Sequence, residues 1–418
     1  MPFHEVSMFF LIVCRIMATN SEYIEEGGGH LLQAKTQIGV VTSLTKLTSN
    51  EILELKKHKR FFCPTCNEEV IIKAGSQVAP HFAHLSKVNC PANEKGEGAY
   101  HEQGKLLLLK WLKDQGYQVS LEAYLPKINQ RPDILLKING KHIAIEYQCA
   151  RIPTEVIHKR NTGYRSIGIT PLWILGANQF KRESSNLIKI DPFTLQFLHQ
   201  FKTPNQHSLY YFDPNTNVLT TAQDLYEVKK RKALAKLKFS HLDQVLFRSM
   251  FLYRQFTKNQ LLTNWIYEKN KFRVQPRKNS YGNDLKWKRL LYQKGIAIDH
   301  LPSIIYLPVS SQFLMKTPLW DWQSRIVLDM INPLKIGAHF SIGKCFALLR
   351  NQSFSSDHFS MLHTIESPIK QYLQWLCKLN IIQQRSATIY EKIREVEFYQ
   401  HIEEAVMGDK QLIYTLMN

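Results

Sequence analysis

The amino-acid sequence predicts an α+β protein that is built from several domains. The chain of 418 residues is long enough for two or three hydrophobic cores. Helical and strand-like hydrophobic patterns alternate in its central part, whereas helical patterns dominate its last half. We expect an N-terminal extension at residues 1–30, a small domain at 31–92, a mixed helix-and-strand core at 93–221, and a basic, mostly α-helical region at 222–418.

The N-terminal extension contains an apolar run from Val6 to Met17 that Arg15 interrupts. The run is shorter than the about 20 apolar residues of a membrane-spanning helix, and no basic segment precedes it as in a signal peptide. Seven cysteines, an odd number, favour a reducing compartment over a disulfide framework. We therefore expect a cytoplasmic protein without membrane insertion; a translation start near Met17 is an alternative explanation of the extension.

Cysteine and histidine spacing in the small domain is typical of a structural zinc site. Cys63 and Cys66 form a CxxC pair, and His81 and His84 follow across an expected hairpin of residues 70–73 and 77–81. Zn²⁺ prefers a tetrahedral set of such ligands. The His-x-x-His spacing is one residue shorter than in the usual finger, so Cys90 is a candidate to replace one histidine. A redox-active CxxC pair beside unrelated histidines is the alternative.

The mixed core is predicted to run in the order helix, three strands, helix, strand. Asn139-Gly140 lies between two apolar alternating runs, which is the strongest short signal for a β-hairpin turn. Pro153 and Gly116 mark the start of the second helix and the end of the first. The expected elements are a helix at 97–115, strands at 117–124, 131–138 and 141–148, a helix at 153–165, and a strand at 172–176.

The expected hairpin places two carboxylates opposite each other. Counting outward from the turn, Asp133 faces Glu146, and paired side chains lie roughly 5 Å apart, where like charges repel. A divalent cation between them removes this repulsion, and Mg²⁺ or Mn²⁺ binds carboxylate oxygens together with a phosphate. Glu97, His101 and Lys105 are spaced by four residues and share one face of the first helix.

The order of elements, with Asp133 before one strand and Glu146-x-Gln148 in the next, resembles the PD-(D/E)xK nuclease superfamily, which has a restriction-endonuclease-like fold. The resemblance implies that Asp133 and Glu146 hold Mg²⁺ and that Glu97 assists from the helix. The third signature residue is normally a lysine; Gln148 can orient water but carries no charge, which leaves cleavage open.

Four further side chains surround this expected site. His101, Lys105 and Arg160 are candidates to hold phosphate or transfer protons, and Arg160 and Tyr164 are candidates to contact DNA. A solvated polar helix face is the alternative for each of them.

A longer set of motifs is similar to the competence protein CoiA family. In chain order these are the CxxC pair, His-Phe-Ala-His, Glu-x-x-x-His-x-x-x-Lys, Arg-Pro-Asp, Ile-Glu-Tyr-Gln and Trp-Ile-Leu-Gly, within residues 60–176. The resemblance implies a cytoplasmic factor that processes DNA during natural transformation and around recombination.

The charge of the chain favours a polyanionic partner. Lysine and arginine exceed aspartate and glutamate by 54 to 35, a formal net charge of +19. Lys229, Lys230, Arg231 and Lys232 lie in an expected helix at 226–238, and basic and aromatic residues interleave at 269–289. This composition is typical of a single-strand-binding surface. A solvated basic face above core aromatics explains the same residues equally well.

Three functions are compatible with these sequence features. The first is a metal-dependent nuclease that acts on incoming DNA. The second is a catalytically inactive DNA-binding adaptor that assists a recombinase, which the Gln148 departure supports. The third is a zinc-dependent transcription regulator, which requires sequence-specific binding to duplex DNA; the sequence displays no helix-turn-helix signature.

Overall fold

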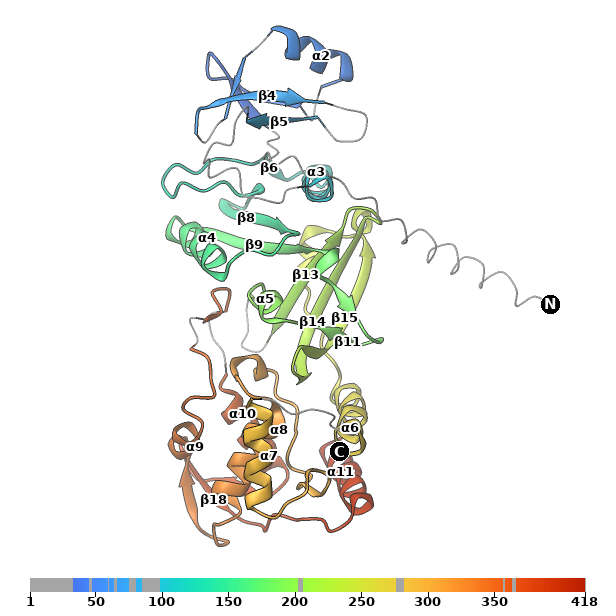
Figure 1. Ribbon diagram of the computed structural model, residues 1–418, viewed down its shortest axis with the longest axis vertical. Helices are drawn as coiled ribbons and strands as arrows, with labels where there is room; N and C mark the ends of the chain where they lie inside the picture. Colours follow the sequence, from blue (N-terminus) through green and yellow to red (C-terminus); the bar gives the residue numbers. More distant parts are fainter. Residues whose placement is uncertain are drawn as a thin grey trace, which may run out of the picture. The chain divides into compact units, whose positions relative to one another are not determined.

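The computed structural model describes residues 33–44, 47–58, 60–63, 66–74, 80–84, 98–201, 206–275, 282–355, 358–362 and 366–417. They belong to two compact units, Met1–Glu97 and Gly98–Asn418 (Figure 1). Among these residues, no helix has both the length and the apolar character needed to cross a membrane. The expected α+β class is confirmed.

The first unit is a small antiparallel sheet with one described helix. Its strands are ordered β2-β1-β3-β4-β5, and Phe61, Val70 and Phe82 are buried in its core. Thr48 and Glu51 cap the helix reciprocally, since each side chain accepts from the other residue's backbone N–H. The elements are β1 (Gln33–Thr36), β2 (Val41–Ser43), α2 (Ser49–His58), β3 (Phe61–Phe62), β4 (Glu69–Lys73) and β5 (His81–His84).

The second unit contains a ten-stranded mixed sheet, ordered β10-β11-β15-β14-β13-β9-β8-β7-β6 with β12 beside β13. The β8–β9 and β9–β13 pairs are parallel. Its elements are α3 (Ala99–Asp114), β6 (Gln118–Leu121), β7 (Ile134–Ile138), β8 (Lys141–Gln148), α4 (Thr154–Ser166), β9 (Ile169–Gly176), β10 (Lys181–Arg182), β11 (Leu187–Lys189), α5 (Pro192–Leu195), β12 (His199–Gln200), β13 (His207–Asp213), β14 (Val218–Lys229) and β15 (Lys232–His241).

The hairpin of β7 and β8 has the register that the turn predicted. Ile134 pairs with Ile145, and Ile138 pairs with Lys141. Asn139 and Gly140 have φ values of 49° and 75°, the left-handed conformations that a two-residue hairpin turn requires. This part of the prediction is confirmed.

Helices α3 and α4 cover opposite faces of the sheet. Gly104 of α3 packs on the ring of Tyr147, whereas Asn161 of α4 accepts a hydrogen bond from the indole of Trp173. Trp173 pairs with Glu146, the strand neighbour of Tyr147, so the two rings point to opposite faces. The ends of β7 and β8 therefore lie between two helices.

The helix expected at 226–238 is wrong. These residues belong to β14 and β15, which form a long hairpin that closes at Lys230 and Arg231. Lysine, alanine and leucine are good helix formers, but Leu234 and Leu237 pair with neighbouring strands and the sheet overrides their propensity. The boundary expected at 221/222 consequently falls inside β14.

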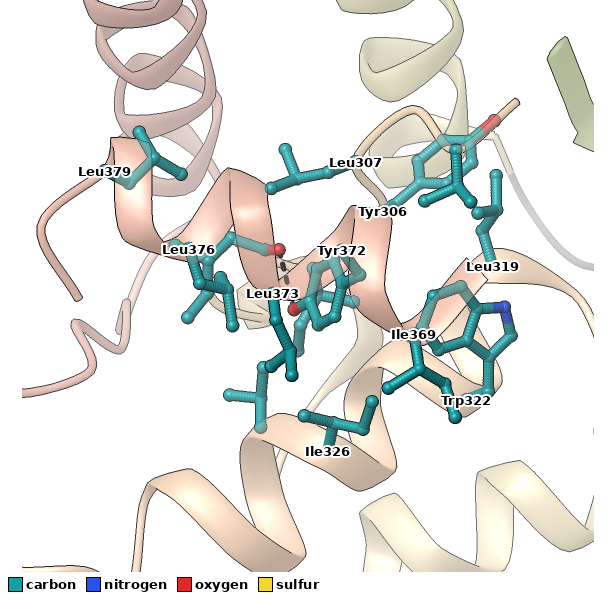
Figure 2. Packing of buried hydrophobic residues seen from close by; sticks show 14 of the residues in the cluster. Tyr306, Leu307, Leu319, Trp322, Ile326, Ile369, Tyr372, Leu373, Leu376 and Leu379 are labelled. Atoms are coloured by element: carbon teal, nitrogen blue, oxygen red, sulfur yellow. Dashed lines mark hydrogen bonds between the residues drawn. The ribbon is translucent and has the colours of Figure 1, made fainter. Parts of the chain in front are cut away.

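The remainder of the second unit is mostly helical. Its helices pack around a core that includes Tyr372, Trp322 and Leu373, and the Tyr372 hydroxyl donates to the Ile304 carbonyl at 3.0 Å (Figure 2). The helices are α6 (Lys258–Val274), α7 (Asn283–Gln293), α8 (Leu319–Arg325), α9 (Ile342–Leu348), α10 (Pro368–Lys378), α11 (Ile402–Met417) and the π-helical turn η7 (Ile326–Ile331).

Short elements complete this unit. A three-stranded sheet has the order β16-β18-β17. Its strands are β16 (His339–Ser341), β17 (Ile382–Gln384) and β18 (Ile389–Lys392), and the 3₁₀ turns are η2 (Ala177–Gln179), η3 (Leu242–Gln244), η4 (Phe247–Phe251), η5 (Ile298–His300) and η6 (Gln312–Leu314).

Candidate functional site

Asp133 lies immediately before β7 and is 8% exposed. Its Oδ2 accepts a hydrogen bond from the Tyr147 backbone N–H at 2.8 Å and lies 3.6 Å from Nε2 of His101. Its Oδ1 lies 3.9 Å from Nζ of Lys105. Burial opposes ionisation, but His101, Lys105 and Arg160 outweigh it and hold the pKa of Asp133 below its ordinary value. These cationic side chains therefore favour the ionised form of the Asp133 carboxyl group.

Glu146 lies in β8 and is held from the other face of the sheet. Nε and Nη2 of Arg160 lie 3.1 and 2.9 Å from Oε1 of Glu146, and the Tyr164 hydroxyl donates to the same oxygen. Burial and the charge of Asp133 raise the pKa of Glu146 to about 8, although Arg160 offsets part of this. The carboxyl groups of Asp133 and Glu146 are thus close enough to influence each other's ionisation.

The two carboxylates are not a simple facing pair with an open gap between them. Asp133 lies outside the strand, so its side chain is free of the strand alternation and points toward α3, while Glu146 points toward α4. Among the described residues, no group of three possible metal ligands within 4.8 Å of one another includes either carboxylate. The repulsion that the sequence predicted is balanced in the structure by cationic side chains of the chain itself.

A buried network of charges connects α3 to this site. Lys105 is fully buried, and its Nζ lies 2.9 Å from Oε1 of Glu102 and 2.7 Å from Oε1 of Glu122. Nη1 of Arg131 lies 3.2 Å from Oε2 of Glu122. Lys105 therefore lies at the centre of a closed ion-pair network, and His101 is the residue of this helix face nearest to Asp133.

Sequence reasoning missed Glu102, Glu122 and Arg131. Glu102 stands three residues before Lys105, a helical ion-pair spacing that was a usable signal. The expected helix also started too early, because α3 begins at Ala99. Glu97 lies outside the described residues, so its predicted role is untested.

Gly104 sets the distance between α3 and the sheet. A Cβ at this position would lie 2.0 Å from a ring carbon of Tyr147. The His101 ring stacks on the same tyrosine, with centroids 5.5 Å apart. Glycine here allows the helix to approach closely enough for His101 and Lys105 to contact Asp133.

Gln148 ends β8 and is half-buried. Its side-chain nitrogen donates to the Ala150 carbonyl at 2.8 Å. This hydrogen bond directs the amide toward the loop after the strand, and the role predicted for Gln148 in orienting water stays a prediction.

Three of the predicted zinc ligands converge in the first unit. One ligand atom each from Cys63, Cys66 and His84 lie within 4.8 Å of one another, and Cys66 Sγ lies 3.2 Å from His84 Nε2. His81 does not belong to this group. Both histidines lie within β5, and residues three apart in a strand point to opposite faces. Cys90 lies outside the described residues.

The residues predicted to contact DNA differ in their exposure to solvent. Tyr164 is fully buried and, like Arg160, is bound to Glu146, so in this arrangement Tyr164 offers no surface to DNA. Lys230 and Arg231 are exposed in the turn between β14 and β15, beside Lys229 and Lys232.

Part of the single-strand-binding surface expected at 269–289 is buried, whereas Lys286 and Arg289 are exposed and stay predicted contacts. Lys269 and Arg273 of α6 are buried and bind Asp409 of α11, and Trp287 is a fully buried core residue. These side chains join helices. Buried ion pairs and buried aromatic residues give a segment the same amino-acid composition as a DNA-binding surface. Composition alone therefore cannot tell the two apart, whereas the packing in the structure does.

Comparisons with known proteins cover most of the chain. Family models match residues 44–93 as the competence protein CoiA N-terminal domain, 97–255 as the CoiA nuclease-like domain, and 261–406 as the CoiA C-terminal domain. A curated relative, competence protein CoiA of Bacillus subtilis (strain 168), is 28% identical over 341 residues, which span 80% of this chain and 90% of the relative. No solved structure matches.

The nuclease-like match extends through β14 and β15 to residue 255, beyond the boundary expected at 221. These two strands complete the sheet that carries Asp133 and Glu146. The three matched domains follow one another in a single order along this chain. The chain belongs to the competence protein CoiA family.

Proposed function

We propose that this protein processes DNA that enters the cell during natural transformation, through a metal-dependent site at Asp133 and Glu146. The observation that carries the proposal is the pair of buried carboxylates at the ends of two adjacent strands of a nuclease-like domain. Burying two carboxyl groups side by side is costly, and groups whose pKa values are strongly shifted cluster at functional sites, which supports the proposal.

The donor set fits a hard divalent ion. Carboxylate oxygens are the ligands that Mg²⁺ and Mn²⁺ prefer, and Asp133 and Glu146 would hold the ion, with Glu97 as a further ligand. A bound ion would supply charge neutralisation at the scissile phosphate and a lowered pKa for a bound water. The cationic side chains that now balance the carboxylates set how strongly an ion competes for them.

The chain's own residues have separate roles in this proposal. His101 and Lys105 hold Asp133 in its ionised form, since both lie within 3.9 Å of its carboxylate. Arg160 and Tyr164 orient Glu146 through its Oε1. Lys105 is fully buried, so we assign it to positioning Asp133 and not to contact with phosphate.

Cleavage assays on isosteric variants test the proposal. Purified wild-type protein, Asp133→Asn, Glu146→Gln and the double variant would be incubated with labelled single-stranded and duplex DNA in Mg²⁺, Mn²⁺ or EDTA. We expect ion-dependent cleavage or nicking by the wild type only, with DNA binding retained by every variant. Cleavage by the double variant at the wild-type rate refutes the proposal. Absence of cleavage by all four proteins supports instead a DNA-binding adaptor without catalysis.

We also propose that Cys63, Cys66 and His84 hold a structural Zn²⁺ in the first unit. The convergence of two thiols and an imidazole within 4.8 Å supports it, because thiolate and imidazole are the ligands that Zn²⁺ prefers. A fourth ligand is needed, and Cys90 is the candidate that the sequence offers.

Metal analysis of the purified protein distinguishes this site from a redox pair. We expect about one zinc per chain in the wild type, a loss in Cys63→Ser and His84→Ala, and retention in His81→Ala. Zinc retained by Cys63→Ser would contradict the assignment.

A further inference from the structure

Four lysines lie side by side across four neighbouring strands of the ten-stranded sheet. Lys181 of β10 pairs with Lys189 of β11. Lys189 pairs with Lys232 of β15, which in turn pairs with Lys229 of β14. Residues that pair across strands share a face, so all four side chains leave the same face of the sheet. We name these residues, Lys181, Lys189, Lys232 and Lys229, the lysine row.

The lysine row has too few acidic partners to be explained by internal ion pairs. Glu183, in the turn between β10 and β11, lies 3.6 Å from Nζ of Lys189 and also binds Lys232. Among the ion pairs of the described residues, this is the carboxylate that contacts the row. Four ammonium groups and one carboxylate leave an excess of three positive charges (4 − 1 = 3). Like charges directly opposite each other destabilise a sheet, so a bound external anion would reduce the repulsion between these lysines.

The positions of the lysines are set by rigid structure. Two residues further along the strands and on the same face, Leu187 pairs with Leu234, and both are buried in the core that the sheet shares with the C-terminal helices. Neighbouring strands lie about 4.8 Å apart, so the row spans about 14 Å, close to the rise of four nucleotides of a DNA strand at about 3.4 Å each. Lys230 and Arg231 extend the row with two more exposed cations at the hairpin turn.

We propose that the lysine row is the surface on which the phosphate backbone of DNA docks. The proposal rests on the proposed function for the identity of the polyanion, and it names where that DNA is held. Every residue of the row lies within the match to the CoiA nuclease-like domain, in a chain whose formal net charge is +19. A lysine ammonium group lacks the two parallel N–H donors with which arginine recognises a base edge. This surface therefore binds the phosphate backbone independently of base sequence.

Charge reversal at two exposed positions tests the surface directly. Lys181→Glu/Lys189→Glu would be compared with Lys344→Glu/Lys370→Glu, which changes the net charge equally at exposed lysines elsewhere. Fluorescence anisotropy with labelled single-stranded and duplex oligonucleotides would be measured in EDTA over a series of salt concentrations. The row variant should bind roughly tenfold or more weakly, with a salt slope smaller by about two, while the control changes less than about threefold.

Removing the single acid provides a test of opposite sign. Glu183→Gln keeps the shape of the side chain but leaves Lys189 and Lys232 available for phosphate. We expect tighter DNA binding, about two- to fivefold, and a variant that merely unfolds cannot produce this. A Lys181→Gln/Lys189→Gln variant with an unchanged melting curve guards against a folding defect in the charge-reversal protein.

The outcomes separate this inference from the proposed nuclease function. Row and control variants that bind DNA equally overturn it, as does a row variant that loses binding to phosphatidylserine vesicles but not to DNA. Weakened binding by the row variant supports it even when no protein cleaves DNA, which would refute only the nuclease. Conversely, ion-dependent cleavage together with unaltered binding by the row variant refutes only the lysine row.

Discussion

Gly104→Ala should destabilise the second unit, although alanine is the better helix former. Its new Cβ would lie 2.0, 2.6 and 2.8 Å from three ring carbons of Tyr147. Ordinary contacts begin at 3.4 Å, so α3 or the ring must move by up to 1.4 Å (3.4 − 2.0). Tyr147 cannot turn away freely, because it is buried and its hydroxyl donates to the Phe212 carbonyl at 3.1 Å.

The magnitude follows from two opposing contributions. Alanine in place of glycine within a helix contributes about 1 kcal/mol of stability, and overpacking a buried contact costs about 1–3 kcal/mol and occasionally more. We expect a net loss of about 1–2 kcal/mol in the free energy of unfolding. The displacement also moves His101 and Lys105 away from Asp133, so any metal-dependent activity should fall more than stability alone explains.

Urea unfolding followed by circular dichroism measures the effect. Gly343→Ala in α9 is the matched control, because the nearest neighbour of its added Cβ, Ser341 Oγ, lies at an ordinary 3.6 Å. This control should be neutral or stabilising. Tyr147→Ala should remove most of the penalty in a double-mutant cycle, since the ring is the obstacle. A Gly104→Ala protein as stable as the wild type would refute the close approach of α3 to Tyr147.

Three further predictions concern stability. Asp409→Asn leaves Lys269 and Arg273 buried without their carboxylate and should cost roughly 3–5 kcal/mol in the free energy of unfolding; a loss below about 1 kcal/mol in urea titrations would contradict it. Burial lowers the pKa of His199 from 6.5 to about 3, so below about pH 6.5 the unfolded chain binds a proton that the folded protein does not. Stability is therefore present at neutral pH and lost as the pH falls toward 3, and His199→Gln should show a shallower loss between about pH 7 and 5 in the urea midpoint. Gly140→Ala, at φ 75°, should cost about 1–2 kcal/mol, whereas Gly140→Asn should cost less; equal midpoints for the two variants would argue against the left-handed turn.

Local signals in the sequence were sufficient where one short interaction decides the conformation. Asn139-Gly140 adopts left-handed conformations that few other residues accept, so it determined the register of the hairpin from Ile134–Ile145 to Ile138–Lys141. The CxxC spacing likewise identified Cys63 and Cys66 as neighbours in space. Both results depend on contacts between residues that are close together in the chain.

Tertiary structure decided what depends on distant partners. The segment at 226–238 has the composition of a basic helix, and it is a hairpin because β11 and β13 supply hydrogen bonds on either side. Its strand conformation places Lys229 and Lys232 opposite each other and continues the row to Lys189 and Lys181, residues that composition alone gave no reason to connect. The sequence left open whether Lys105 serves the site or faces solvent, and the structure buries it in an ion-pair network with Glu102 and Glu122.

By itself, the sequence determined the family, the α+β class and the two carboxylates at the centre of the candidate site. Only the tertiary structure decided which cations surround each carboxylate and which basic residues form a continuous surface. The physical reason is the sequence separation of the interacting residues. Turn conformation and short spacings depend on residues that are close together in the chain, whereas the environment of a charge depends on every element that packs against it.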